Sequence, residues 1–123
     1  MNRTFVSLGS GLAFFGIALG AFGTHSLRKH LSAPSLEIWQ TGVQYHLIHA
    51  VALVIVGILA ASNDTKAVRV AGWLMAAGIA IFSGSLYALA ISGVRILGAI
   101  TPLGGLCFLG AWATLCVNFA RRP

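Results

Sequence analysis

Two histidines lie near the start of an apolar stretch that is long enough to cross a lipid bilayer. His46 and His49 are three residues apart in "TGVQYHLIHAVALVIVGILAA", residues 41–61, beside Gln44 and Tyr45. On a helix, residues three or four apart are neighbours, so Tyr45, His46 and His49 form a polar stripe. Imidazoles bind metals, relay protons or form hydrogen bonds between helices. At membrane depth a lone charge is costly, so these rings must be neutral or paired.

The helices that position these residues follow from the distribution of charge. Hydrophobic residues make up 58% of the 123 residues and charged residues only 8%, whereas about 25% is usual in soluble domains. Four stretches of 24–26 residues lack Lys, Arg, Asp and Glu, and about 20 helical residues span the hydrocarbon. The sequence therefore predicts an all-α membrane protein, a bundle of four transmembrane helices with short connections. We expect one domain, residues 1–123, with helices at 4–24, 34–61, 67–91 and 97–119.

The N-terminal stretch also has features of a signal peptide, because it combines a basic start, an apolar run and small residues near Gly23. Its apolar part is longer than the ~7–15 residues typical of such signals. Small residues recur at helical spacing, which permits close contact between helices; they are Gly9, Ala13, Gly16, Gly20 and Gly23. We therefore expect the segment to be retained as a transmembrane helix.

The basic residues indicate how the chain is oriented in the membrane and which partners it has. With four spans, one side of the membrane holds Arg3, Lys66, Arg69, Arg121 and Arg122, and the other holds Arg28, Lys29 and Arg95. The excess favours N- and C-termini in the cytoplasm for this multi-pass protein. The net charge of +6 is scattered over helix ends, so membrane lipids are the expected counterions and nucleic acid is not an expected partner.

The same topology places Glu37 and Arg95 at the outer rim. Arg95 stands between Val94 and Ile96 in an apolar connection, and the chain has only two carboxylate side chains. A half-buried arginine needs an acceptor. We therefore predict an ion pair between Glu37 and Arg95; the alternative is that Arg95 extends to a lipid phosphate.

Three motifs carry a family resemblance: "GAFGTHSL" at 20–27, "WQTGVQYHLIHAVAL" at 39–53 and "FSGSLYALAISGVRILGAITPLGGLCFLGAW" at 82–112. They resemble the small membrane family catalogued as domain of unknown function 423, which includes bacterial inner-membrane proteins and the animal transmembrane protein 256. The resemblance implies a four-helix integral membrane protein and carries no agreed reaction. The family pattern matches at His25, Trp39, Tyr45, His49, Ser83, Tyr87, Arg95 and Pro102.

Three interpretations compete for the expected polar intramembrane cluster, which comprises Gln44, Tyr45, His46, His49, Ser83 and Tyr87. The first is structural: Gln44, Tyr45 and His49 form hydrogen bonds with Ser83, Ser85 or Tyr87 on the third helix, which fixes the register of the helices. The second is a metal or haem site, in which His25 or His30 joins His46 and His49. The third is a carrier for a small solute or for protons.

An enzyme is not expected. No carboxylate stands near the histidines to orient a catalytic base, and "PLGGL" lacks the Gly-Lys-Ser/Thr of a phosphate loop. We expect no cofactor. We expect the protein to be a structural, assembly or membrane-organising component that self-associates through small-residue helix faces.

Overall fold

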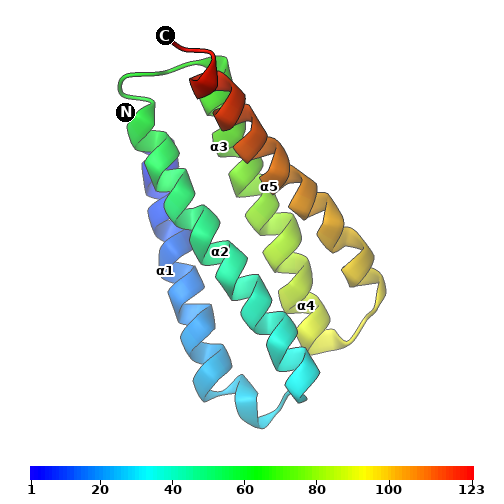
Figure 1. Ribbon diagram of the computed structural model, residues 1–123. Coiled ribbons are helices and arrows are strands. Elements are labelled where there is room, and N and C mark those ends of the chain that lie inside the picture. Colours follow the sequence, from blue (N-terminus) through cyan, green and yellow to red (C-terminus); the bar gives the residue numbers. More distant parts are fainter.

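The computed structural model describes residues 1–123 and contains four helices long and apolar enough to cross a membrane (Figure 1). In chain order the elements are α1 (Arg3–His25), the 3-10 helix η1 (Leu27–Lys29), α2 (Ala33–Leu59), α3 (Lys66–Gly78), the π-helical turn η2 (Ile79–Ser83), α4 (Gly84–Ser92) and α5 (Ile96–Ala120). The elements α3, η2 and α4 form one continuous span. The all-α four-helix prediction is confirmed, and the expected ranges differ from the observed spans by at most two residues at either end.

Local signals explain where the helices begin and end. The side chains of Asn2, Ser32 and Thr65 accept hydrogen bonds from backbone N–H groups in the first turns of α1, α2 and α3, which satisfies donors that have no partner within the helix. Pro34 stands in the first turn of α2, where its missing N–H is not needed. Gly93 ends α4 with a φ of 70°, a conformation that glycine adopts without strain.

The helices are arranged so that α1 and α5 lie on the two outer sides (Figure 1). Helix α1 packs mainly on α2, α2 contacts the α3–η2–α4 span, and this span in turn packs on α5. Both chain termini and the connection between α2 and α3 lie at one end of the bundle, while η1 and the connection between α4 and α5 lie at the other (Figure 1).

The apolar core is concentrated in the half of the bundle that holds the termini. Phe5, Leu53, Val56 and Met75 are fully buried there. Phe5 contacts the backbone of α3 so closely that a Cβ added at Gly72 would collide with its ring. Large apolar side chains also cover the outside of the bundle, as expected for a surface whose solvent is lipid rather than water.

Glycines bring α1 and α2 together. Gly9, Gly16 and Gly23 are all buried, and a Cβ at Gly9 would lie 2.7 Å from the Val54 side chain and 2.8 Å from the Ala50 carbonyl oxygen. Small residues at this spacing let two backbones approach closely. This face of α1 therefore packs inside the bundle and is not available to a second copy.

Candidate functional site

His46 lies where α1, α2 and α4 meet, and its side chain is only 4% exposed. Its Nε2 is 2.7 Å from the carbonyl oxygen of Leu12 on α1, and its Nδ1 is 2.8 Å from the hydroxyl oxygen of Tyr87 on α4. A carbonyl only accepts hydrogen bonds, so Nε2 carries the hydrogen and Nδ1 accepts from the Tyr87 hydroxyl. The Tyr87 hydroxyl could also accept from a charged ring, but a charge at membrane depth is costly, so His46 is neutral and both of its nitrogens are engaged.

The imidazole reaches the α1 backbone because Gly16 has no side chain. Gly16 lies one turn after Leu12, and a Cβ added there would be 3.2 Å from the His46 ring and 2.7 Å from the Leu47 side chain. A Cβ there would displace the Leu47 side chain and press the His46 ring away from the Leu12 carbonyl by a few tenths of an ångström. The glycine is therefore a condition of the His46 contact.

Trp39 makes the corresponding contact nearer the start of α2. It is 3% exposed, and its indole N–H donates to the carbonyl oxygen of Leu19 at 3.0 Å. A Cβ at Gly23 would collide with the indole ring, so here again a glycine one turn after the acceptor makes room for the donor. A buried indole N–H needs such an acceptor because it cannot reach water.

Ser83, the last residue of the π-helical turn, connects the third span to α2. Its hydroxyl is fully buried and donates to the carbonyl oxygen of Gly42 at 2.7 Å. Gly42 also accommodates Tyr87, since a Cβ there would lie 2.9 Å from the Tyr87 ring. Ser83 and Tyr87 therefore bind α2 at successive levels, through Gly42 and His46.

The π-helical turn also brings the third span against α5. A Cβ at Gly104 would collide with the backbone nitrogen of Phe82, so the two backbones touch directly. Nearby, the hydroxyls of Ser85 and Thr101 share a hydrogen bond of 2.6 Å. π-Helical turns inside longer helices occur frequently at functional sites, and this one forms contacts to both neighbours of the span.

His49 points toward α5 and is also 4% exposed. Its Nδ1 is 2.8 Å from the Tyr45 carbonyl oxygen, and the indole N–H of Trp112 donates to its Nε2 at 3.0 Å. Nδ1 therefore carries the hydrogen, so His49 has the opposite tautomer to His46 and is likewise neutral. The imidazole stacks on the ring of Phe108, with ring centroids 3.6 Å apart.

An aromatic groove of about 530 Å³ opens beside His49. We use the term aromatic groove for the space lined by Tyr45, His49, Phe82, Pro102, Gly105, Leu106, Phe108, Leu109 and Trp112. Tyr45 is 40% exposed, and its ring lies 4.7 Å from that of Phe82. The groove is mostly apolar, and its one imidazole is already bonded through both nitrogens.

The predicted polar cluster divides into two parts. His46, Ser83 and Tyr87 come together between α2 and the third span, whereas His49 lies with Tyr45 on the side of α5. The predicted hydrogen bonds from Gln44, Tyr45 and His49 to the third span do not form. Because each residue turns the helix by about 100°, Gln44 faces outward when His46 faces inward, and His49 is rotated toward α5.

The predicted metal candidates do not converge. His25 and His30 are exposed near the rim that carries η1, and no group of three or more His, Cys, Asp or Glu residues is placed to hold a metal ion. His46 and His49 point to different neighbours, and each has one nitrogen that donates and one that accepts. Their lone pairs are directed at Tyr87 and Trp112.

The predicted ion pair between Glu37 and Arg95 does not form either. Both residues are exposed, and the single ion pair in the structure joins Arg69 and Asp64 at 2.7 Å. The reason is topological: α4 packs against both α2 and α5 and separates them. The connection that carries Arg95 runs away from the start of α2 (Figure 1).

Several participants are not among the residues predicted from the sequence. The backbone carbonyls of Leu12, Leu19 and Gly42 have no side-chain pattern. The others are side chains of α5, those of Thr101, Phe108 and Trp112. Trp112 was detectable in principle, because an indole N–H in an apolar helix needs an acceptor and His49 is one of the few available.

The helices and their internal polar contacts define a small integral membrane protein of the four-helix class. The profile of the family described as "Protein of unknown function (DUF423)" matches residues 19–105, and the chain belongs to this family. It is 47% identical over 116 residues to the UPF0382 membrane protein YwdK of Bacillus subtilis, covering 94% of each chain. It is 40% identical to the UPF0382 membrane protein SH2409 of Staphylococcus haemolyticus, again over 94% of each. No solved structure matches.

Proposed function

We propose that this protein is a structural component of the bacterial inner membrane, not an enzyme, and that its intramembrane histidines stabilise the bundle instead of handling a ligand or a proton. The observation that carries the proposal is the hydrogen bonding of the two rings. Each imidazole donates through one nitrogen to a backbone carbonyl and accepts through the other from Tyr87 or Trp112. Both nitrogens of each ring are thus bonded within the protein.

The same pattern weighs against the two other interpretations. A metal or haem iron needs a free lone pair on an imidazole nitrogen, and binding to His46 or His49 would break the hydrogen bond from Tyr87 or Trp112. A proton relay needs a nitrogen that gains and loses hydrogen during transport. A second hydrogen on His49 would point at the Trp112 N–H, which can only donate, and one on His46 would use the Tyr87 oxygen as acceptor and leave the Tyr87 O–H without one.

The test compares buried with exposed histidines in protein purified in mild detergent without a His-tag. His46→Ala and His49→Ala should each lower the free energy of unfolding by about 1–3 kcal/mol, because hydrogen bonds and packing are lost. His25→Ala and His30→Ala are the matched controls, since both side chains are exposed, and they should leave thermal stability unchanged.

The same four variants separate the alternatives. We expect no stoichiometric metal, no visible absorbance and no proton flux into liposomes for the wild type. A metal or a haem absorption band that disappears in His49→Ala would overturn the proposal in favour of a cofactor protein. Flux that falls in His46→Ala or His49→Ala but not in the controls would favour a carrier.

The proposal places both termini in the cytoplasm. The end of the bundle that holds them carries Arg3, Lys66, Arg69, Arg121 and Arg122, against Arg28, Lys29 and Arg95 at the other end, and the positive-inside tendency supports this orientation. A green fluorescent protein fused after Pro123 should fluoresce, and alkaline phosphatase fused there should be inactive. The opposite pair of results would reverse the orientation.

Self-association is also part of the proposal, and the outer face of α1 is the surface assigned to it. Ser7, Gly11 and Ala18 are exposed on this face, and a Cβ at Gly11 would meet nothing within 4 Å. Ser7 and Gly11 are four residues apart, a spacing of small side chains that permits close contact between helices. Gly11→Leu should convert an oligomer into a monomer in analytical ultracentrifugation. A wild type that is monomeric in both detergent and nanodiscs contradicts this assignment.

A further inference from the structure

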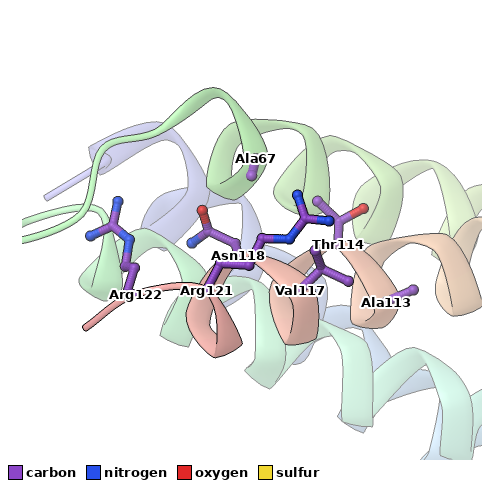
Figure 2. A pocket seen from close by; sticks show the side chains of 7 residues that line it. All are labelled: Ala67, Ala113, Thr114, Val117, Asn118, Arg121 and Arg122. Atoms are coloured by element: carbon purple, nitrogen blue, oxygen red, sulfur yellow. The ribbon is translucent and has the colours of Figure 1, made fainter.

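A cleft lies between the start of α3 and the last turns of α5, at the end of the bundle that holds the termini (Figure 2). Its volume is about 620 Å³, within the usual range of ligand pockets. It is lined by Ala67 of α3 and by Ala113, Thr114, Val117, Asn118, Arg121 and Arg122 of the C-terminal part of the chain. We call it the headgroup cleft, for the reasons that follow.

The cleft exists because its facing residues are small. Ala67 faces α5 from one wall, and Ala113 and Val117 contribute only short apolar side chains to the other. The two walls are joined beneath it, since the hydroxyl of Thr65, the N-cap of α3, donates to the side-chain oxygen of Asn118 at 3.4 Å. The spacing of the walls is thus set by contacts within the protein.

The cationic residues of the cleft have no anionic partner. The only ion pair uses Arg69 and Asp64, and Glu37, the other carboxylate side chain, lies in the first turns of α2 at the opposite end. Arg121 and Arg122 therefore line the cleft with two guanidinium groups that have no ion-pair partner; Figure 2 shows the Arg121 side chain extending along α5 toward Thr114 and the Arg122 side chain at the end of α5. Guanidinium groups bind phosphate through paired N–H donors.

The position of the cleft along the membrane normal points to the ligand. Helix α5 has 25 residues and is about 38 Å long, which exceeds the ~30 Å hydrocarbon core. Its last turn therefore reaches the headgroup region, while Val117 and Ala113 lie progressively deeper. Below the arginines the lining combines the polar side chains of Thr114 and Asn118 with the short apolar side chains of Val117 and Ala113. A phospholipid has a matching order of groups, from its phosphate through its ester groups to its acyl chains.

We propose that the headgroup cleft binds an anionic phospholipid. Arg121, whose side chain extends over the cleft, holds the phosphate, Arg122 adds positive charge at the end of α5, and an acyl chain lies along Val117 and Ala113 against Ala67. Basic pockets between transmembrane helices are known to accept anionic headgroups on the cytoplasmic side. The histidine contacts within the bundle take no part in this site, so this proposal and the proposed function fail independently.

The test measures lipid bound to the full-length protein by native mass spectrometry, with phosphatidylglycerol or phosphatidylcholine added to detergent-solubilised protein. We expect phosphatidylglycerol to bind more tightly. The double variant R121Q/R122Q should weaken its binding about thirtyfold, at about fivefold for each lost charge near the surface. The matched control is R28Q/K29Q, which removes two charges at the other end and should change binding little.

A second variant tests the apolar part of the site while keeping both arginines. Ala113→Trp fills the cleft and should reduce binding of phosphatidylglycerol, whereas Ala99→Trp, on the exposed start of α5, should not. Equal binding of the two lipids, or equal losses in R121Q/R122Q and R28Q/K29Q, would overturn the proposal. Inorganic phosphate that competes with phosphatidylglycerol at similar affinity would overturn the assignment to a lipid and leave a free-anion site.

Discussion

Trp39 and His46 lie seven residues apart on α2, and each donates a ring N–H to the backbone of α1. The two accepting carbonyls, those of Leu19 and Leu12, are also seven residues apart and occur in reverse order. An antiparallel pair of helices is thus held in register at two levels by the same kind of contact. In lipid, a hydrogen bond between helices contributes about 0.6–1.7 kcal/mol, so the two together are a substantial part of the stability of a small bundle.

Gly16→Ala should destabilise the protein, because the added Cβ would lie 2.7 Å from Leu47 and 3.2 Å from the His46 ring. We expect a loss of about 1–3 kcal/mol, as for overpacking in other cores. Thermal unfolding in detergent, followed by circular dichroism, measures it. Gly105→Ala is the control, since its Cβ would lie 3.8 Å from the Phe82 side chain, an ordinary contact, and it should change stability little. Equal losses in both variants would show that the His46 contact is not the cause.

Trp39→Phe should lower stability by about 1 kcal/mol, because it removes the N–H that binds the Leu19 carbonyl and leaves most of the aromatic packing in place. Trp73→Phe is the matched change, since Trp73 is 56% exposed and its indole N–H donates to no group in the protein. Unfolding in the same detergent compares the two. A Trp73 variant that loses as much as the Trp39 variant contradicts the assigned contact.

The two buried histidines should give different ¹⁵N spectra. We expect the hydrogen on Nε2 in His46 and on Nδ1 in His49, because these nitrogens face carbonyl oxygens. Solid-state NMR of the ¹⁵N-histidine-labelled protein in lipid distinguishes the two neutral tautomers, and His46→Ala and His49→Ala assign the signals. Identical tautomers, or a charged ring at neutral pH, would refute the hydrogen-bond pattern.

Gly104→Ala and Gly105→Ala should differ sharply although the residues are adjacent. A Cβ at Gly104 would collide with the backbone of Phe82 in the π-helical turn, whereas one at Gly105 would lie 3.8 Å from the Phe82 ring, an ordinary contact. We expect a loss of about 1–3 kcal/mol or more for the first variant and little change for the second. Similar melting temperatures for the two would mean that α5 and the third span are not in backbone contact.

The fold was predictable because it depends on the spacing of charged residues along the chain, which the sequence displays directly. Charges are too costly to leave in the hydrocarbon, so gaps between Arg3, Arg28, Glu37 and the later charges locate the spans. The glycine spacing in the first span likewise predicts a close helix contact, and the structure assigns it to α2.

The site was only partly predictable. That His46 and His49 must be bonded follows from burial, but which neighbours they meet depends on the rotation of each helix about its axis, which an all-apolar surface does not specify. The carbonyl acceptors at Leu12 and Leu19 have no sequence signal. The predicted contact between Glu37 and Arg95 is wrong because two residues on the same side of the membrane need not lie on adjacent helices.

The π-helical turn at Ile79–Ser83 sets the rotational phase of α4 relative to α3. A π-helical turn takes one residue more than an α-helical turn, and a single residue corresponds to about 100° of rotation in a regular helix. If the same residues followed an uninterrupted α-helix, every side chain of α4 would be rotated by about that amount, and the place opposite His46 that Tyr87 now occupies would pass to Leu86. The hydrogen bonding of α2 to the third span thus depends on the length of one turn as much as on the identity of the residues that form the bonds.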